Sequence, residues 1–182
     1  MHYCDYTATL PPDNPHRRYH DHEYGYPIAE DDRLFERLVF EINQAGLSWT
    51  IILNKADNLR RAYDHFDIAR IAAYGEADIA RLLADVGIIR NRRKIAAAIH
   101  NARVIRELQA AHGSFRAWLD AQVGADKATW VKLFKKTFAF TGPEITGEFL
   151  MSSGYLEGAH RRDCPVYTQI LAAHPRWLTG GG

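Results

Sequence analysis

The chain has 182 residues, of which 47% are hydrophobic and 25% charged, with a net charge of +1. This length suits one folded unit, and the composition excludes a disordered or low-complexity chain. The first residues lack a basic segment followed by an apolar run, and no stretch approaches the ~20 apolar residues of a membrane span. We therefore expect a cytoplasmic protein with no membrane partner, one folded unit over residues 1–178 and a disordered tail over 179–182.

Helical periodicity dominates the sequence. Apolar residues recur at helical spacing over residues 31–46, where the first turn is acidic and Gly46 ends the run. Asp67 and Glu76 are N-terminal signals for two later helices. No alternating strand pattern of convincing length occurs, so we expect an all-α fold. The expected helices cover residues 31–46, 58–65, 67–73, 76–85, 92–112, 114–122, 128–137, 144–153 and 165–174.

A short apolar turn separates the helices expected at 76–85 and 92–112, so helix, turn and helix follow one another. No acid occurs from Gly87 to Arg106. A local excess of positive charge favours contact with nucleic acid even when the net charge is small. The alternative is that the basic residues form the solvated faces of helices. These residues are Arg90, Arg92, Arg93, Lys94, Arg103 and Arg106.

The two cysteines, Cys4 and Cys164, each have a histidine at a suggestive spacing, His20 and His160 respectively. Two thiolates and two imidazoles form a closed tetrahedral set, which is typical of structural zinc. Because catalytic zinc keeps an open position, the set argues against a zinc-dependent hydrolase. From spacing alone, the alternatives are two buried free thiols or a disulfide, and a disulfide is disfavoured in the cytoplasm.

The first 50 residues are rich in rings with polar tips, which suit a pocket for a flat heterocycle. Glu41 is a more specific indication of such a pocket than the rings are. At ~100° per residue it falls about 20° from Leu34 on the helix, so its carboxylate points toward the core side. The alternative is that Glu41 lies at the edge of the apolar stripe and its carboxylate reaches solvent or an arginine. The rings belong to Tyr6, His16, Tyr19, His20, His22, Tyr24, Tyr26 and Trp49.

Several blocks of the sequence together resemble the DNA-3-methyladenine glycosylase I family. They are the run from Tyr19 to Gly25 (YHDHEYG), then Glu41, then the run from Gln44 to Trp49 (QAGLSW), and the run DVGIIRNRRKI at 85–95. The resemblance covers roughly residues 1–170. It implies a helix-hairpin-helix DNA glycosylase fold with the hairpin within 76–112. It also implies a monomer that hydrolyses the N-glycosidic bond of 3-methyladenine in alkylated double-stranded DNA and releases the free base.

The resemblance implies roles for individual residues. Cys4, His20, His160 and Cys164 match the family's four zinc ligands, so that one structural Zn²⁺ per chain would join the terminal segments 1–25 and 155–175. Trp49 is expected to stack on the flipped base, Glu41 and Tyr19 to contact its edge as catalytic residues, and Tyr6, Tyr24 and His16 to complete the walls. The DNA backbone is expected to meet Gly87, Arg90, Asn91, Arg92 and Lys94.

Some positions depart from the family pattern. Members usually carry tryptophan where this chain has Tyr24, often tryptophan where it has Tyr6, and an aromatic residue where it has His16. No acid occurs between Asp85 and Glu107, so we expect selection by the pocket rather than by a strong nucleophile. The departures suggest an alternative function, in which a DNA-damage-binding zinc protein has weakened or lost turnover.

Overall fold

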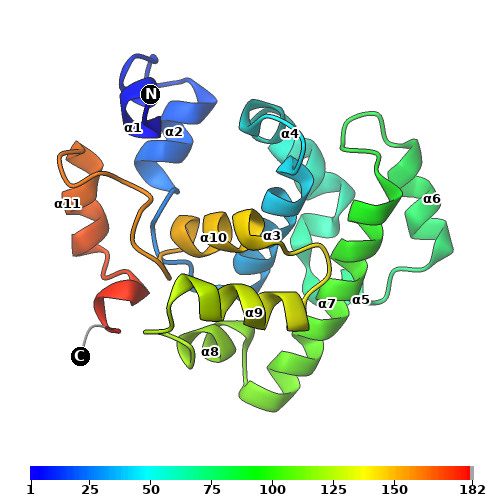
Figure 1. Cartoon of the computed structure of the whole chain (residues 1–182). Helices are drawn as coiled ribbons and strands as arrows, with labels where there is room; N and C mark the ends of the chain where they lie inside the picture. Colours follow the sequence, from blue (N-terminus) through cyan, green and yellow to red (C-terminus); the bar gives the residue numbers. More distant parts are fainter. Residues whose placement is uncertain (181–182) are drawn as a thin grey trace.

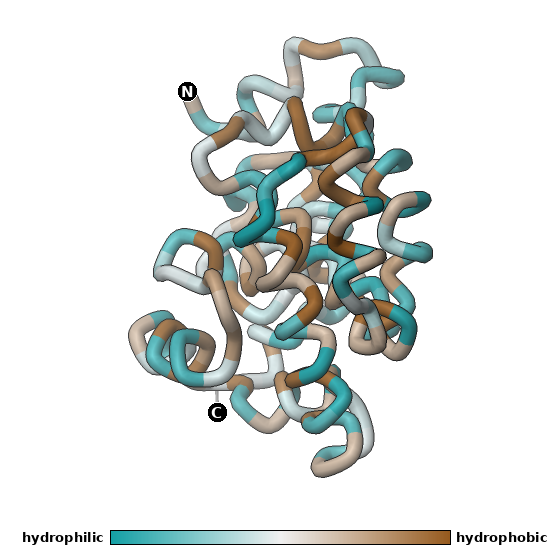
Figure 2. Tube along the Cα trace, turned by 90° about the vertical axis from the view of Figure 1, so that its right-hand side faces the viewer, coloured by the Kyte–Doolittle hydropathy of each residue, from teal (hydrophilic) through white to brown (hydrophobic). Residues whose placement is uncertain are grey.

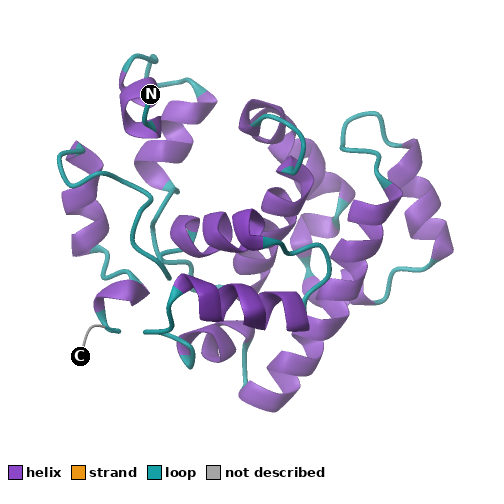
Figure 3. Cartoon of the chain, viewed as in Figure 1, coloured by secondary structure: helices purple, strands orange, loops and turns teal. Residues whose placement is uncertain are grey.

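Helices form the regular structure of residues 1–180, the part of the chain that the computed structural model describes (Figures 1 and 3). Residues 1–180 contain no strand, which confirms the all-α expectation. None of the described helices is long and apolar enough to cross a membrane. In chain order the elements are α1 (Tyr3–Ala8), α2 (Pro15–His22), α3 (Asp31–Gln44), α4 (Trp49–Ala62), η1 (Asp64–Phe66), α5 (Ile68–Ala72), α6 (Glu76–Ala84), α7 (Arg92–His112), α8 (Phe115–Asp120), α9 (Lys127–Thr137), α10 (Pro143–Ser152), α11 (Pro165–Ala172) and η2 (Arg176–Leu178).

Helix α3 lies at the centre of the fold and packs against α4, α7, α8 and α10 (Figure 1). Every residue from Leu34 to Asn43 is buried, so α3 has no solvent-facing side over this length. Its first residue, Asp31, accepts hydrogen bonds from the backbone amides of Phe115 (2.9 Å) and Arg116 (3.0 Å) and thereby caps α8. Because α3 is enclosed, the charged side chains on it are carried into the interior.

Two clusters of buried apolar residues hold the fold together. The large one lies between α3 and the helices around it, and Figure 2 shows hydrophobic and hydrophilic residues alternating along these helices. The small one joins the two ends of the chain through Cys4 of α1 and three residues of the C-terminal segment, Cys164, Val166 and Ile170. Helices α1, α2 and α11 therefore lie together on one side of the molecule (Figure 1).

The helix positions differ from expectation mainly near the N-terminus. Helices α3 and α7 lie where the periodicity predicts them, but α1 and α2 were not predicted. Asn14 caps α2 through a 2.9 Å hydrogen bond from the His16 amide, with Pro15 in the first turn, a recognisable start signal. The bounds of the helix expected at 58–65 are wrong: residues 58–62 are the end of α4, which begins at Trp49, and η1, whose residues have positive φ, follows it.

Residues 85–91 connect α6 to α7 and are hydrogen-bonded to α4 and α7. The Asp85 carboxylate accepts from the Gly87 amide at 2.8 Å, and the Gly87 carbonyl accepts from Lys55 and Asn58 of α4, each at 3.2 Å. Asn91 caps α7 by accepting from two amides of its first turn. The turn is therefore fixed in place relative to α4 as well as α7.

The sequence predicts a disordered tail over residues 179–182, of which the structure describes residues 179 and 180. The Thr179 hydroxyl donates to the Arg176 carbonyl at 2.8 Å, and Gly180 packs against Gly124. Residues 181–182 lie outside the described part of the chain.

Candidate functional site

A cavity of about 690 Å³ is lined by residues of α1, α2, α3, α4 and α10 and the loops beside them. Its walls carry two kinds of side chain. Four aromatic rings, those of Tyr3, Tyr19, Tyr24 and Trp49, face three carboxylates, those of Glu41, Glu144 and Glu148. Flat apolar faces together with acidic groups suit a planar ligand that carries hydrogen-bond donors or positive charge.

The rings form one continuous wall. The Tyr19 and Trp49 ring centroids lie 5.1 Å apart, and those of Tyr19 and Tyr24 lie 5.5 Å apart. Tyr3 meets Tyr24 edge-on at 5.7 Å. These distances are in the range of favourable aromatic pairs, so each ring fixes the orientation of the next.

Glu41 is the buried carboxylate of this cavity. Its side chain is 5% exposed, and it makes no hydrogen bond or ion pair to any group in residues 1–180. Burial raises the pKa of Glu41 to about 8, while nearby Arg37 acts to lower this pKa and Glu148 to raise it. The alternative that the side chain lies on the solvated surface is therefore wrong, because Glu41 is buried and lines the cavity.

Tyr19 is oriented by the arginine one turn before Glu41. The Arg37 guanidinium donates to Tyr19 Oη at 3.2 Å and to the Ser152 carbonyl at 3.2 Å, and it lies 5.0 Å from the centroid of the Tyr19 ring. Because the phenol oxygen accepts this bond, its own hydrogen is free to donate to a ligand. Burial is the main cause that raises the pKa of Tyr19 well above its ordinary value, so the phenol stays protonated.

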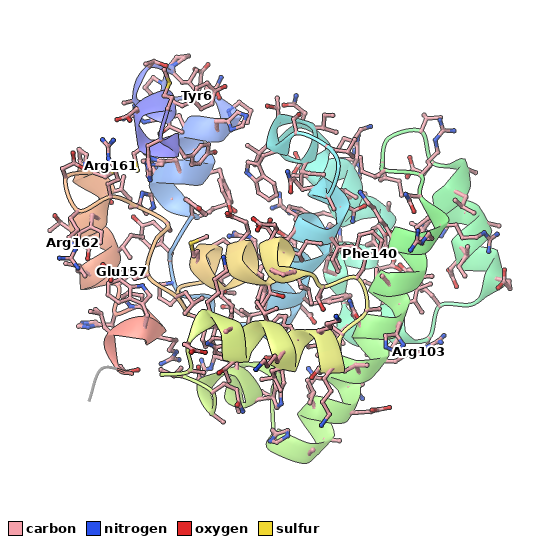
Figure 4. The ribbon with its side chains drawn as sticks, in the orientation of Figure 1. Tyr6, Arg103, Phe140, Glu157, Arg161 and Arg162 are labelled. Atoms are coloured by element: carbon pink, nitrogen blue, oxygen red, sulfur yellow. The ribbon has the colours of Figure 1, made fainter. Side chains whose placement is uncertain are left out.

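Two predicted pocket residues do not line the cavity. Tyr6 is 38% exposed and lies at the outer side of the N-terminal helices (Figure 4), with its ring edge against His16. His16 is buried behind the wall, where its nitrogens are bonded to Tyr3 Oη (3.0 Å) and Thr50 Oγ1 (2.8 Å). The expectation that Tyr6 and His16 contact the ligand is corrected accordingly: Tyr3 lines the cavity, and His16 positions Tyr3.

The basic residues around residues 85–91 separate into exposed and internal ones. Arg90 and Arg92 are exposed. Lys94 is buried, and its ammonium donates to the carbonyls of Asn43 (2.8 Å) and Ala45 (2.7 Å) at the end of α3. Lys94 thus supports the cavity rim from inside, which corrects its expected contact with phosphate.

Other residues predicted for the basic, DNA-facing surface also have hydrogen-bond partners within the protein. Arg103, labelled in Figure 4, donates to the carbonyls of Ala72 (2.9 Å) and Tyr74 (3.0 Å). Gly87 has its amide engaged by Asp85, and the Asn91 side chain caps α7. Arg90 and Arg92 are the predicted residues whose charged groups face outward, and Arg92 lies 3.8 Å from the exposed carboxylate of Glu76.

The two cysteines and two histidines form a buried group that could hold a metal ion. Cys4, His20, His160 and Cys164 each offer a ligand atom, and these atoms all lie within 4.8 Å of one another. The outer nitrogen of each ring is bonded away from the group: His20 Nδ1 to Asp21 (2.7 Å), and His160 Nε2 to the Tyr24 carbonyl (2.6 Å).

These outer bonds assign the tautomers of the two rings. A carboxylate and a carbonyl both accept, so both outer nitrogens carry hydrogens and the inner nitrogens present lone pairs. The inner nitrogens, His20 Nε2 and His160 Nδ1, are 3.2 Å apart. Two lone pairs that face each other at this distance fit a cation between them.

Comparisons with known proteins are consistent with this geometry. A family model described as methyladenine glycosylase matches residues 10–167. The chain belongs to the methyladenine glycosylase family. DNA-3-methyladenine glycosylase 1 of Escherichia coli K12 is 33% identical over 82% of this chain and 89% of the relative, and the Haemophilus influenzae DNA-3-methyladenine glycosylase is 30% identical over 82% and 91%.

Solved structures of this glycosylase family share the fold. A crystal structure of 3-methyladenine DNA glycosylase I superposes with a TM-score of 0.78 at 33% identity, covering 86% of this chain and 96% of that one. The Staphylococcus aureus enzyme, whose structure describes 3-methyladenine recognition, gives a TM-score of 0.80 at 29% identity, covering 91% and 97%. The resemblance seen in the sequence is thereby confirmed.

Among the aromatic and acidic residues that line the cavity of this glycosylase family member, sequence reasoning missed three. Tyr3 precedes the first recognisable block, and Glu144 and Glu148 lie on α10, more than 90 residues after Trp49. One signal was present: Glu148 is followed directly by the buried Phe149 and Leu150. The sequence does not show that α10 packs against α3, so this signal alone would not have led to the cavity.

The raised pKa of Glu41 predicts a pH-dependent effect of Glu41→Gln on stability. Between pH 4.5 and pH 8 the folded protein holds a proton on Glu41 that the unfolded chain releases, so the burial cost of this group grows as pH rises. Relative to the original chain, Glu41→Gln should therefore gain about 2 to 4 kcal/mol of unfolding free energy across this window. Urea unfolding at pH 5 and pH 8.5 measures this gain, and a constant difference would contradict the shifted pKa.

Proposed function

We propose that this chain is a DNA repair glycosylase that hydrolyses the N-glycosidic bond of 3-methyladenine in alkylated double-stranded DNA. The observation that carries the proposal is the buried, unpartnered Glu41 carboxylate, which faces an aromatic wall in a cavity large enough for a purine. Family membership and the activities named for the relatives support it.

In the proposed reaction the damaged nucleotide flips out of the helix, at a cost of a few kcal/mol, and its base enters the cavity. An N3-methylated adenine carries positive charge in the nucleoside, so its base contacts the aromatic faces of Trp49 and Tyr19 favourably. The positive charge of the bound base lowers the pKa of Glu41, so that its ionised carboxylate accepts from the exocyclic amine, and the free Tyr19 hydroxyl donates to the base edge. Water adds to the sugar C1′ as the bond to the base breaks, the added water gives up one proton to the solvent, and the base leaves neutral.

The DNA backbone is held by the turn at 85–91 and the start of α7. Among residues 1–180 the amides of Ile89 and Arg90 have no partner, and the Arg90 and Arg92 side chains are exposed beside them. Backbone amides at a helix start and basic side chains are ordinary phosphate ligands. Lys94 connects this surface to the cavity rim, so phosphate and base would be bound on adjoining parts of one rigid unit.

The proposal includes one structural Zn²⁺, held by Cys4, His20, His160 and Cys164. Tetrahedral ligands at zinc's usual bond lengths lie about 3.3 to 3.8 Å from one another. The Cys164 Sγ atom is 3.7 Å from His20 Nε2 and 3.8 Å from His160 Nδ1, and Cys4 Sγ is 3.8 Å from His160 Nδ1. The ion would join the terminal segments 1–25 and 155–175 and contribute folding free energy, with no part in bond cleavage.

The activity is tested by measuring free 3-methyladenine released from methylated DNA. Glu41→Gln keeps the size of the side chain but removes its charge, and should lower kcat/KM by about 10- to 100-fold, the effect of losing a charged hydrogen bond. Trp49→Ala should weaken product binding by about 1 to 3 kcal/mol through lost stacking. Glu107→Gln, an exposed change on α7, is the matched control.

Two outcomes of this assay contradict parts of the proposal. If the original chain binds methylated DNA but releases no base, it is a damage-binding protein rather than a glycosylase. If Glu41→Gln is folded and fully active, the carboxylate has only a structural role.

The DNA surface is tested by the salt dependence of duplex binding. Arg90→Ala/Arg92→Ala should reduce the magnitude of the log-salt slope by about 1.8, or ~0.9 for each lost phosphate contact. Arg162→Ala removes an exposed charge beside α11, on the opposite side of the molecule from α7 (Figure 4), and should leave the slope unchanged. An unchanged slope in the double variant would place the DNA surface elsewhere.

The metal is tested by elemental analysis of the purified chain. One zinc per chain is expected, and Cys164→Ala should lose it and unfold at a lower temperature, because binding energy at this closed set is folding energy. Base release by any folded fraction of the variant is compatible with the structural role. Stoichiometric zinc in Cys164→Ala would overturn the ligand assignment.

A further inference from the structure

We propose that Glu148 determines specificity in this cavity, acting with Glu41 to favour a purine that carries positive charge over a neutral one. The inference rests on the proposed function, because it concerns which bases that cavity selects. Glu148 lies on α10 and lines the cavity together with Glu41 of α3, so two packed helices each direct one carboxylate into the same space.

The position of Glu148 is set by a tyrosine of the aromatic wall. Tyr24 Oη donates to Glu148 Oε2 at 3.3 Å. Burial raises the pKa of Glu148, and the bond from Tyr24 acts to lower this pKa. The Tyr24 backbone carbonyl is in turn held by His160 at 2.6 Å. The carboxylate is therefore oriented by a ring whose own backbone is fixed.

The basic groups near the cavity leave its negative charge only partly compensated. The Arg37 guanidinium is occupied by Tyr19 Oη, the Ser152 carbonyl and Glu23. Lys127 also acts on Glu148, from the exposed first turn of α9, where its side chain passes over Gly147. Glu144 adds a further carboxylate one turn before Glu148. A cationic ligand would relieve the repulsion among these groups, whereas a neutral one would not.

The charge would act on binding more than on bond cleavage. When the bond between C1′ and the base nitrogen breaks, its electron pair goes to the base, which becomes neutral while positive charge develops on the sugar. A carboxylate that stabilises the charged base therefore acts mainly on the bound ground state. Removing such a group should raise KM without lowering kcat, and kcat should rise to the extent that the interaction is lost in the transition state.

Two small probes of similar ring size test this selectivity by calorimetry at pH 8: 3,9-dimethyladeninium, a permanent cation, and neutral 3-methyladenine. Glu148→Gln should weaken binding of the cation about tenfold, as expected for losing one interaction with a charged group, and binding of the neutral base less than threefold. Glu148→Asp keeps the charge and should retain most of the preference for the cation. Glu107→Gln should match the original chain.

Equal losses for both probes in Glu148→Gln would indicate a structural role, and no loss for either would also overturn the proposal. If the glutamine variant does not fold, Glu148→Asp and Glu148→Asn provide a pair that differs only in charge. On methylated DNA, Glu148→Gln should raise KM without lowering kcat. An original chain that releases no base refutes the proposed function, while the calorimetric comparison still decides the role of Glu148.

Discussion

The enclosure of α3 is the constraint on which the site depends. Because α3 packs on α4, α5, α7, α8 and α10, Glu41 is carried into the interior and is left open only toward the cavity. The Glu41 carboxylate has no hydrogen-bond partner in residues 1–180, because the nearby Arg37 guanidinium donates instead to Tyr19 Oη and the Ser152 carbonyl. Burying an uncompensated ionisable group costs stability, and a binding cavity is where such a cost has a functional use.

The aromatic wall depends on contacts between distant parts of the chain. Tyr3 and Tyr24 belong to N-terminal segments that lie against the C-terminal segment, and His160 fixes the Tyr24 backbone. The Cys4, His20, His160 and Cys164 group lies immediately behind this wall. A structural metal there would stabilise the position of rings that face the ligand without contacting the ligand itself.

The proposed DNA surface and the cavity share their supports. Helix α4 begins with Trp49 at the cavity and, farther along, holds the Gly87 carbonyl through Lys55 and Asn58. Lys94 bridges the start of α7 and the end of α3. Displacing the turn at 85–91 would therefore disturb the cavity rim, which gives a physical reason for a buried lysine in an otherwise exposed basic run.

The sequence by itself determined the all-α class, the positions of α3 and α7, and the family, because helical periodicity and contiguous blocks are local properties of the chain. It also brought together Cys4 and Cys164 with their histidines as one ligand set. Only the tertiary structure decided which side of the wall a residue occupies: Tyr6 lies outside and Tyr3 inside, a difference set by the packing of α1 against α2. It likewise decided that Lys94 turns inward and that Glu148 faces Glu41, because both depend on contacts between helices far apart in the chain, which local periodicity does not encode.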